Sequence, residues 1–144
     1  MNRILIENDN VENLYSDDIE IVDNVVNFKK NGEYVFEYIN CDNINIRYNV
    51  FDNVMIKLTE YADNQKLCIN NEYNLGSYSN LVLFKFYNNK GVDELITLNL
   101  NGQYSKVSYN FSSISFFDEK YNVVINHNAS FTESFISNKS MAIL

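Results

Sequence analysis

From Glu33 onward, one short strand-like segment follows another, with no convincing helical segment between them. The segments begin near residues 34, 44, 54, 66, 81, 94, 106, 121, 131 and 141, at a spacing of roughly 10 to 15 residues. Strands that alternate with helices would indicate βαβ units, whereas strands that follow one another directly indicate a sandwich, a barrel or a β-solenoid. The sequence therefore predicts an all-β protein.

Within these segments, apolar side chains alternate with polar ones. Because successive side chains of a β-strand point to opposite faces, this alternation indicates one buried face and one face in water. Three sets of residues that share a face are Tyr34, Phe36 and Tyr38; Ile44, Ile46, Tyr48 and Val50; and Leu81, Leu83 and Lys85.

This periodicity does not fix the order of the strands in space. An antiparallel β-sandwich needs tight hairpins, and Asn31-Gly32 and Asn101-Gly102 are suitable turns. The other gaps are rich in Asn, Asp and Ser and fit the wider corners of a β-helix. A parallel β-solenoid and an antiparallel β-sandwich both stay open at this point. Residues 1–32 form a lead-in segment in either case, and residues 33–144 form the solenoid-like domain.

Asparagine would have to form most of the turns, because the chain has 26 Asn but only four Gly and no Pro. Asn tolerates left-handed backbone conformations and bonds to nearby backbone groups. Stacked Asn side chains also suit the repeated corners of a solenoid. An AT-rich genome would raise the Asn content as well, and the two explanations are compatible.

The net charge of −8 disfavours general affinity for nucleic acid or anionic membranes, since both require a basic surface. The first residues lack the apolar stretch of a signal peptide, and no segment approaches the roughly 18 apolar residues of a membrane-spanning helix. We therefore expect a cytoplasmic protein that binds neither nucleic acid nor membrane. Both cysteines, Cys41 and Cys68, should be free, buried thiols within strands.

Few residues could carry catalysis. A single histidine, His127, cannot build a metal site without other ligands, and the two cysteines form no metal-binding cluster with it. Ser130, Thr132 and Ser134 are close to His127 in sequence, but no feature marks one of them as an activated nucleophile. We therefore expect no enzymatic activity, no metal site and no resident cofactor.

The segment around His127 resembles part of a known family. The relevant residues are Gln103–Tyr109, Tyr121–Ser134 and Lys139–Ile143, with a weaker match of pattern at Asp52–Tyr61. Together they resemble the SufB/SufD family of iron–sulfur cluster assembly proteins, in which a histidine, a stretch of small residues and Thr-x-Ser precede a β-segment. Those positions correspond here to His127, Thr132 and Ser134.

The resemblance implies a right-handed parallel β-helix that acts as a scaffold or accessory component in cluster assembly, beside a SufC-like ATPase. An iron–sulfur cluster would bind only within such a complex. The chain lacks a counterpart of the family's later Cys-Ser-His-Gly-Ala-Thr-like motif, so it would be a short or truncated member. The alternative is a non-catalytic β-rich interaction module unrelated to cluster assembly.

The apolar segment Ser140–Leu144 predicts a partner. An unpaired apolar strand exposes backbone donors and acceptors that favour association with another chain. We expect a homodimer or a hetero-complex through the C-terminal rungs of the solenoid.

Overall fold

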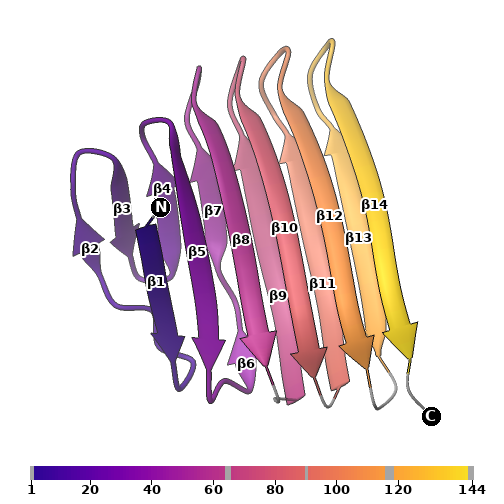
Figure 1. Ribbon diagram of the computed structural model, residues 1–144. Coiled ribbons are helices and arrows are strands. Elements are labelled where there is room, and N and C mark those ends of the chain that lie inside the picture. Colours follow the sequence, from indigo (N-terminus) through magenta and orange to yellow (C-terminus); the bar gives the residue numbers. More distant parts are fainter. Residues whose placement is uncertain (1, 64–65, 90, 116–118, 143–144) are drawn as a thin grey trace.

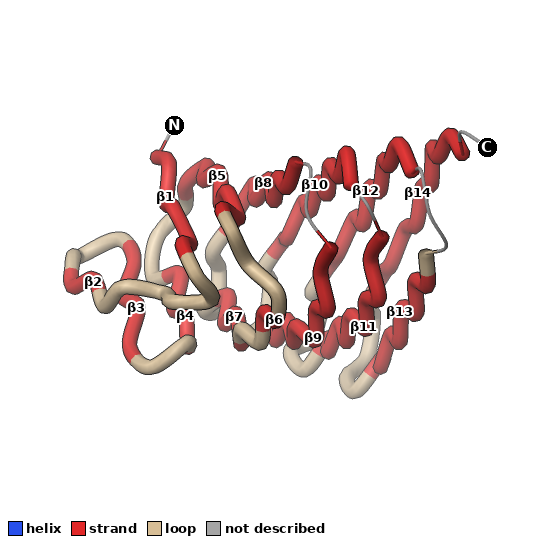
Figure 2. Tube along the Cα trace, turned by 90° about the horizontal axis from the view of Figure 1, so that it is seen from below, coloured by secondary structure: helices blue, strands red, loops and turns tan. Residues whose placement is uncertain are grey.

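A computed structural model describes residues 2–63, 66–89, 91–115 and 119–142, and these residues form a parallel β-solenoid of about four turns (Figure 1). Two sheets lie face to face as separate layers, which Figure 2 shows from below. The solenoid prediction is confirmed. The sandwich alternative is wrong, because most neighbouring strands are parallel. The described residues contain no helix that is long and apolar enough to cross a membrane.

The two layers are sheet A and sheet B. In spatial order, sheet A contains β1 (Asn2–Glu7), β5 (Gly32–Ile39), β8 (Met55–Asp63), β10 (Asn80–Asn89), β12 (Lys106–Ser115) and β14 (Glu133–Ala142). Sheet B contains β13 (Lys120–His127), β11 (Gly91–Leu100), β9 (Lys66–Leu75), β7 (Arg47–Val50), β4 (Val25–Phe28), β3 (Ile19–Val22) and β2 (Leu14–Tyr15), and the short β6 (Asn43–Ile44) pairs with β9.

The chain passes between the sheets at every turn. Each strand from β8 onward pairs in register with the strand one turn later, 25 to 27 residues further along the chain. Such pairing places residues of successive turns in columns, so one position in the sequence repeat always faces the same neighbours.

The first strands belong to both sheets, β1 to sheet A and β2, β3 and β4 to sheet B. Strand β1 pairs with β5 in parallel, and β4 pairs with β7 in parallel. Between them, β3 and β4 form an antiparallel hairpin whose turn residues, Asp23 and Asn24, have φ values of 50° and 64°. Two consecutive left-handed residues are typical of a hairpin turn that matches the strand twist. Antiparallel strand pairs therefore occur only at this end of the described structure.

Most predicted segments agree with the strands, but the run predicted from Ile44 to Val50 is split into β6 and β7, and the segments at the end also differ. The segments that begin near residues 131 and 141 are a single strand, β14, so the predicted break between them is wrong. The last part of the predicted terminal segment, residues 143–144, lies outside the described residues.

The core lies between the two sheets. All members of the three sets predicted to share a face are buried, Lys85 included. Aromatic rings from successive turns stack on one another, and the rings of Tyr48 and Tyr73 are 4.7 Å apart and nearly parallel. Each fully buried Leu, Ile or Phe side chain contributes about 1.5–3 kcal/mol to folding. The in-register columns therefore supply most of the driving force.

The corners that lead from sheet B to sheet A use a left-handed residue at one repeated position. These residues are Asn53, Tyr78, Tyr104 and Phe131, with φ between 56° and 61°. Asn is a common choice there, but a bulky aromatic residue is unusual. The three aromatic rings stack in sequence, with centroids 5.1 Å apart for Tyr78–Tyr104 and 4.9 Å apart for Tyr104–Phe131.

These corners also pack closely on one another. A Cβ atom on Gly102 would lie 2.0 Å from the backbone nitrogen of Ser77, so only glycine fits there. Ser77 in turn donates its backbone N–H to the Asp52 carboxylate of the preceding turn, at 2.7 Å.

A ladder of asparagine side chains runs along the outer face of sheet B. From Asn49 onward, each amide nitrogen donates to the amide oxygen of the previous turn, at distances between 2.8 and 3.1 Å. The ladder consists of Asn27, Asn49, Asn74, Asn99 and Asn126. The sequence predicts stacked Asn side chains at the corners, and there Asn128 donates to Asn101 of the preceding turn at 2.9 Å. The longer ladder lies within the strands of sheet B, where stacking was not predicted.

Candidate functional site

The three residues of the family resemblance come together at the corner between β13 and β14. His127 Nδ1 lies 2.6 Å from Thr132 Oγ1, and Nε2 lies 3.2 Å from Ser134 Oγ. The Thr132 hydroxyl also donates to the Ala129 carbonyl, at 3.4 Å. In the neutral tautomer that fits these contacts, Nδ1–H of His127 donates to Thr132 and Nε2 accepts a hydrogen bond from the Ser134 hydroxyl.

This corner places a serine beside a histidine, but the described hydrogen bonds of His127 do not include the carboxylate of a catalytic triad. The group at Nδ1 is a threonine hydroxyl, whereas a triad uses a carboxylate that stabilises the imidazolium. In the preceding turn, the residues in register with His127 and Ser134 are the buried Leu100 and Val107. In the last described turn, the hydrogen bonds of His127 therefore stabilise the corner between β13 and β14.

The cysteines differ in their surroundings. Cys41 is buried in the loop between β5 and β6, not in a strand as predicted, and its thiol donates to the Ile6 carbonyl at 3.2 Å. Burial raises the pKa of the Cys41 thiol, so this thiol is a poor nucleophile. The prediction that Cys68 is buried is wrong. It lies on β9 between the inward-facing Leu67 and Ile69, so its own side chain points outward.

Neither cysteine builds a metal site. Both thiols are free, as predicted. No group of three or more His, Cys, Asp or Glu side chains that could hold a metal ion occurs among the described residues.

The interior contains a cluster of charged residues that connects the two sheets. Lys85 Nζ on β10 lies 3.0 Å from Glu60 on β8 and 3.4 Å from Glu94 on β11, and all three side chains are fully buried. The ammonium group also lies over the rings of Tyr73 and Tyr87, at 5.6 and 5.9 Å from their centroids. A buried charge is tolerated only when it is paired and hydrogen-bonded.

Tyrosine hydroxyls complete the coordination of both carboxylates. Glu60 accepts hydrogen bonds from Tyr38, from Tyr48 at 2.9 Å and from Tyr73 at 2.6 Å. Glu94 accepts one from Tyr109 at 2.7 Å. Burial, and then the nearby carboxylates, raise the pKa of each of these four tyrosines. The two sheets enclose this cluster, and because its charged side chains are fully buried, a ligand in solvent does not reach them.

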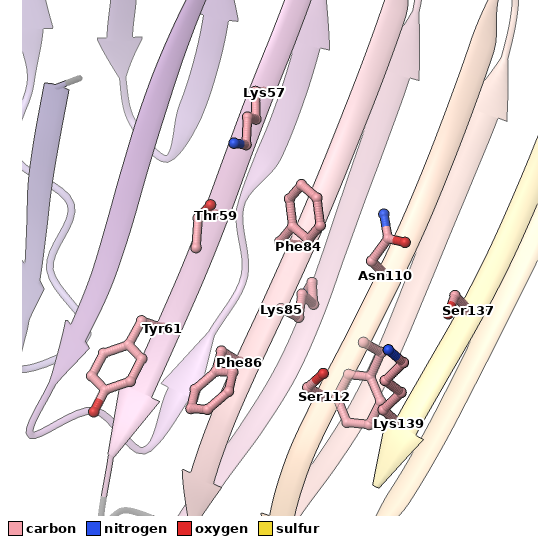
Figure 3. Close-up of a pocket in the computed structure, with 11 residues that line it drawn as sticks. Lys57, Thr59, Tyr61, Phe84, Lys85, Phe86, Asn110, Ser112, Ser137 and Lys139 are labelled. Carbon is pink, nitrogen blue, oxygen red and sulfur yellow. The ribbon is translucent and has the colours of Figure 1, made fainter.

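The outer face of sheet A carries a groove of about 500 Å³ that runs over β8, β10, β12 and β14 (Figure 3). Its floor follows β12, where the outward side chains are short and polar. Phenylalanine rings of β10 form one wall. This arrangement follows from the strand register, because in-register positions on three strands carry residues of different size.

One row of the groove contains Phe86, Ser112 and Lys139 in register on β10, β12 and β14. Tyr61 of β8 stacks on one face of the Phe86 ring, at 6.0 Å and an angle of 16°. On the other side Ser112 is too short to cover the ring, so that face borders the groove. Lys139 extends from β14 toward the floor (Figure 3).

The neighbouring row contains Phe84, Asn110 and Ser137 in the same register. The amino group of Lys57 lies 5.5 Å from the centroid of the Phe84 ring and 3.5 Å from a Glu33 carboxylate oxygen. The other side of Phe84 faces Asn110, again a smaller residue. Two rings therefore present a face to the same groove.

The groove differs in charge from the molecule as a whole. The chain has a net charge of −8, yet three lysines and no carboxylate line the groove. The side chain of Lys85 is buried in the core, so the exposed cations of the groove are Lys57 and Lys139. Lys57 has a partner in Glu33, whereas no ion pair reaches Lys139 from the described residues. A negatively charged group would therefore bind beside Lys139 without competition from a carboxylate of the described residues.

Sequence reasoning identified the face of this site but not the site. The alternation of 81–86 placed Phe84 and Phe86 on the face opposite Lys85, and both rings are exposed on sheet A. The short residues opposite them lie 26 residues further on, and only the register of a solenoid brings these together.

The fold and this groove define a class of protein: a parallel β-solenoid with an aromatic-walled groove on its outer face. Comparisons with protein-family models, with characterised proteins and with solved structures find no match. Membership of the SufB/SufD family therefore stays a prediction.

Proposed function

We propose that this protein is a non-catalytic binding module, and that it holds a negatively charged ligand in the groove of sheet A. The observation that carries this proposal is the juxtaposition of the uncovered face of Phe86 with Lys139 across the short Ser112. An apolar face next to a cation favours a ligand that has both a flat apolar side and an anionic group.

The scaffold suits such a role. The groove has the volume of ordinary ligand sites, roughly 300–1,000 Å³. Most of its side chains project from β8, β10 and β12, which are paired on both sides, whereas Ser137 and Lys139 project from the edge strand β14. Sites on strands hold their geometry better than sites on loops. The ligand would therefore meet a site that is already formed.

The test uses 1-anilinonaphthalene-8-sulfonate, an aromatic anion whose fluorescence rises in apolar surroundings. We expect saturable binding that weakens about tenfold in Phe86→Ala and in Lys139→Gln. Leu95→Ala and Lys66→Gln are the matched controls, because they remove an exposed apolar residue and an exposed lysine from sheet B. Equal affinity in all four variants would contradict the groove as the binding site.

The scaffold role in iron–sulfur cluster assembly is the second candidate. Two observations support it: the parallel solenoid that the resemblance implies, and the contact of His127 with Thr132 and Ser134. Co-expression with a SufC-like ATPase, followed by affinity purification, tests it. Stable association that His127→Ala weakens would support the role, and absence of any complex would contradict it.

Self-association through the C-terminal rungs remains part of the proposal. Strands β13 and β14 are the edge strands on this side of the described structure. Ile136 is in register with the buried Tyr109 but is itself 50% exposed, so the core is open here. A second copy that packs against this end would cover it. Light scattering after size-exclusion chromatography should give the mass of a dimer, and a monomer at high concentration would contradict it.

A further inference from the structure

We infer that the ligand of the sheet A groove is an acidic saccharide, a chain of sugar rings that carry carboxylates. This inference rests on the proposed function, because it assigns a chemical class to the ligand of the same groove.

The ring faces select a ligand with a flat apolar side. An aromatic face carries partial negative charge and attracts polarised C–H groups as well as cations. One side of a pyranose ring presents such C–H groups. Phe84 and Phe86, two residues apart on β10, are 37% and 45% exposed, and about 7 Å separates alternate residues along a strand. They can therefore support neighbouring parts of one chain.

The floor of the groove suits hydroxyl groups. Ser112 and Asn110 on β12 and Ser137 on β14 offer short side chains that both donate and accept hydrogen bonds. The Asn110 amide nitrogen already donates to the Leu83 carbonyl at 3.4 Å. Among the described contacts its amide oxygen has no donor, so this oxygen can accept a hydrogen bond from a ligand. A sugar, which has a hydroxyl on most ring carbons, can use several such groups at once.

The backbone of the floor excludes the usual mode of peptide capture. Extended peptides bind β-proteins by adding a strand to an open sheet edge. Strand β12 is paired along its whole length with β10 on one side and β14 on the other. A peptide that lies on this floor would find no unpaired backbone donors or acceptors of β12, so only its side chains could bind there.

The charge of the groove selects the acidic form of the saccharide and disfavours nucleic acid. Lys139 has no carboxylate partner among the described residues, and a sugar carboxylate would supply one. Nucleic acid also stacks on aromatic rings, but it requires a continuous basic surface. Two lysines on a chain with a net charge of −8 do not provide that surface.

Isothermal titration with defined oligosaccharides tests the inference on the full chain. The probes are oligomers of galacturonate, mannuronate and glucuronate, and the matched control is the methyl-esterified galacturonate oligomer, which keeps the sugar and loses the charge. Oligoglutamate represents an acidic peptide. We expect at least one uronate oligomer to bind, with about tenfold weaker binding after esterification, in Lys139→Gln and in Phe86→Ala.

The outcomes separate this inference from the proposed function. If the sulfonate dye binds the groove but none of the three uronate oligomers does, the saccharide class is wrong and the groove remains a binding site. Binding of oligoglutamate with equal or higher affinity overturns it in favour of an acidic peptide. If neither dye nor saccharide binds, the proposed function fails as well. Circular dichroism of each variant verifies that the solenoid is still folded.

Discussion

Lys85 Nζ lies 3.0 Å from a carboxylate oxygen of Glu60 in the interior of the solenoid, and both side chains are fully excluded from water. Glu94 approaches the same ammonium group from sheet B at 3.4 Å. The ion cluster therefore crosses from one sheet to the other. Because its members satisfy one another, the loss of one leaves the remaining charges buried without compensation.

Replacement of Lys85 by methionine should strongly destabilise the fold. The substitution keeps the length of the side chain but leaves Glu60 and Glu94 without their cation, and breaking a buried pair costs about 3–5 kcal/mol. Urea unfolding followed by circular dichroism measures this loss. The control is Lys57→Met, which removes a half-exposed lysine of sheet A and should cost less than about 1 kcal/mol. Equal effects of both substitutions would contradict the role of the cluster.

Alkaline pH should unfold the protein over a narrow range. The pKa values of Tyr38, Tyr48, Tyr73 and Tyr87 are raised well above 10, first by burial and then by carboxylates that include Glu60. Below pH 10 these phenols are protonated in both states, so their contribution is complete. Above pH 10 only the unfolded chain releases the protons, and stability falls by about 1.4 kcal/mol per pH unit for each tyrosine.

This alkaline transition has a clear optical signature. Phenolate absorbance of the buried tyrosines should rise together with the loss of the β-sheet circular dichroism signal. Ionisation of those tyrosines at a lower pH than the pH at which the sheet signal is lost would contradict the hydrogen bonds between their hydroxyls and the carboxylates.

The burial of Glu60 and Glu94 could have been predicted if the alternation of inward and outward residues had been extended further along each strand. The inward set that includes Leu58 continues two residues later to Glu60, and the inward set of Ile96 extends back to Glu94. Charged residues normally end such a pattern, because most of them are exposed. Only the contact of Glu60 and Lys85 of sheet A with Glu94 of sheet B, which the solenoid creates, compensates these buried charges.

The groove and the burial of the cysteines were harder to predict. The register between β10 and β12 depends on the number of residues in the corner, and Tyr104 gave no sign of a left-handed turn. Cys68 stands between apolar neighbours, and the sequence alone does not show whether such a short apolar run is buried on one face or on both. The pairing of β9 within a two-layer solenoid decides this question and turns the thiol outward.

At the corner position Tyr104, glycine should be tolerated better than alanine. Tyr104 has a φ of 60°, a conformation that costs an L-residue about 1–2 kcal/mol and glycine almost nothing. Both substitutions remove the stacking with Tyr78 and Phe131, but only Tyr104→Gly relieves the strain. We expect Tyr104→Ala to be less stable than Tyr104→Gly by about 1 kcal/mol in thermal unfolding. The opposite order, which an ordinary strand position would give, would contradict the strained corner.

The asparagine ladder should show a dependence on position. Asn74 lies inside the ladder, where it donates to Asn49 at 3.1 Å and accepts from Asn99 at 2.9 Å, whereas Asn126 at the end only donates to Asn99. A hydrogen bond of this kind contributes about 0.5–1.5 kcal/mol. Asn74→Ala should therefore cost about twice as much as Asn126→Ala in urea unfolding. The double variant with Asn49→Ala should cost less than the sum of the single effects, because neighbouring members share a bond. Additive effects of equal size at all positions would mean that the amides act singly, each through its own solvation, and not as a ladder.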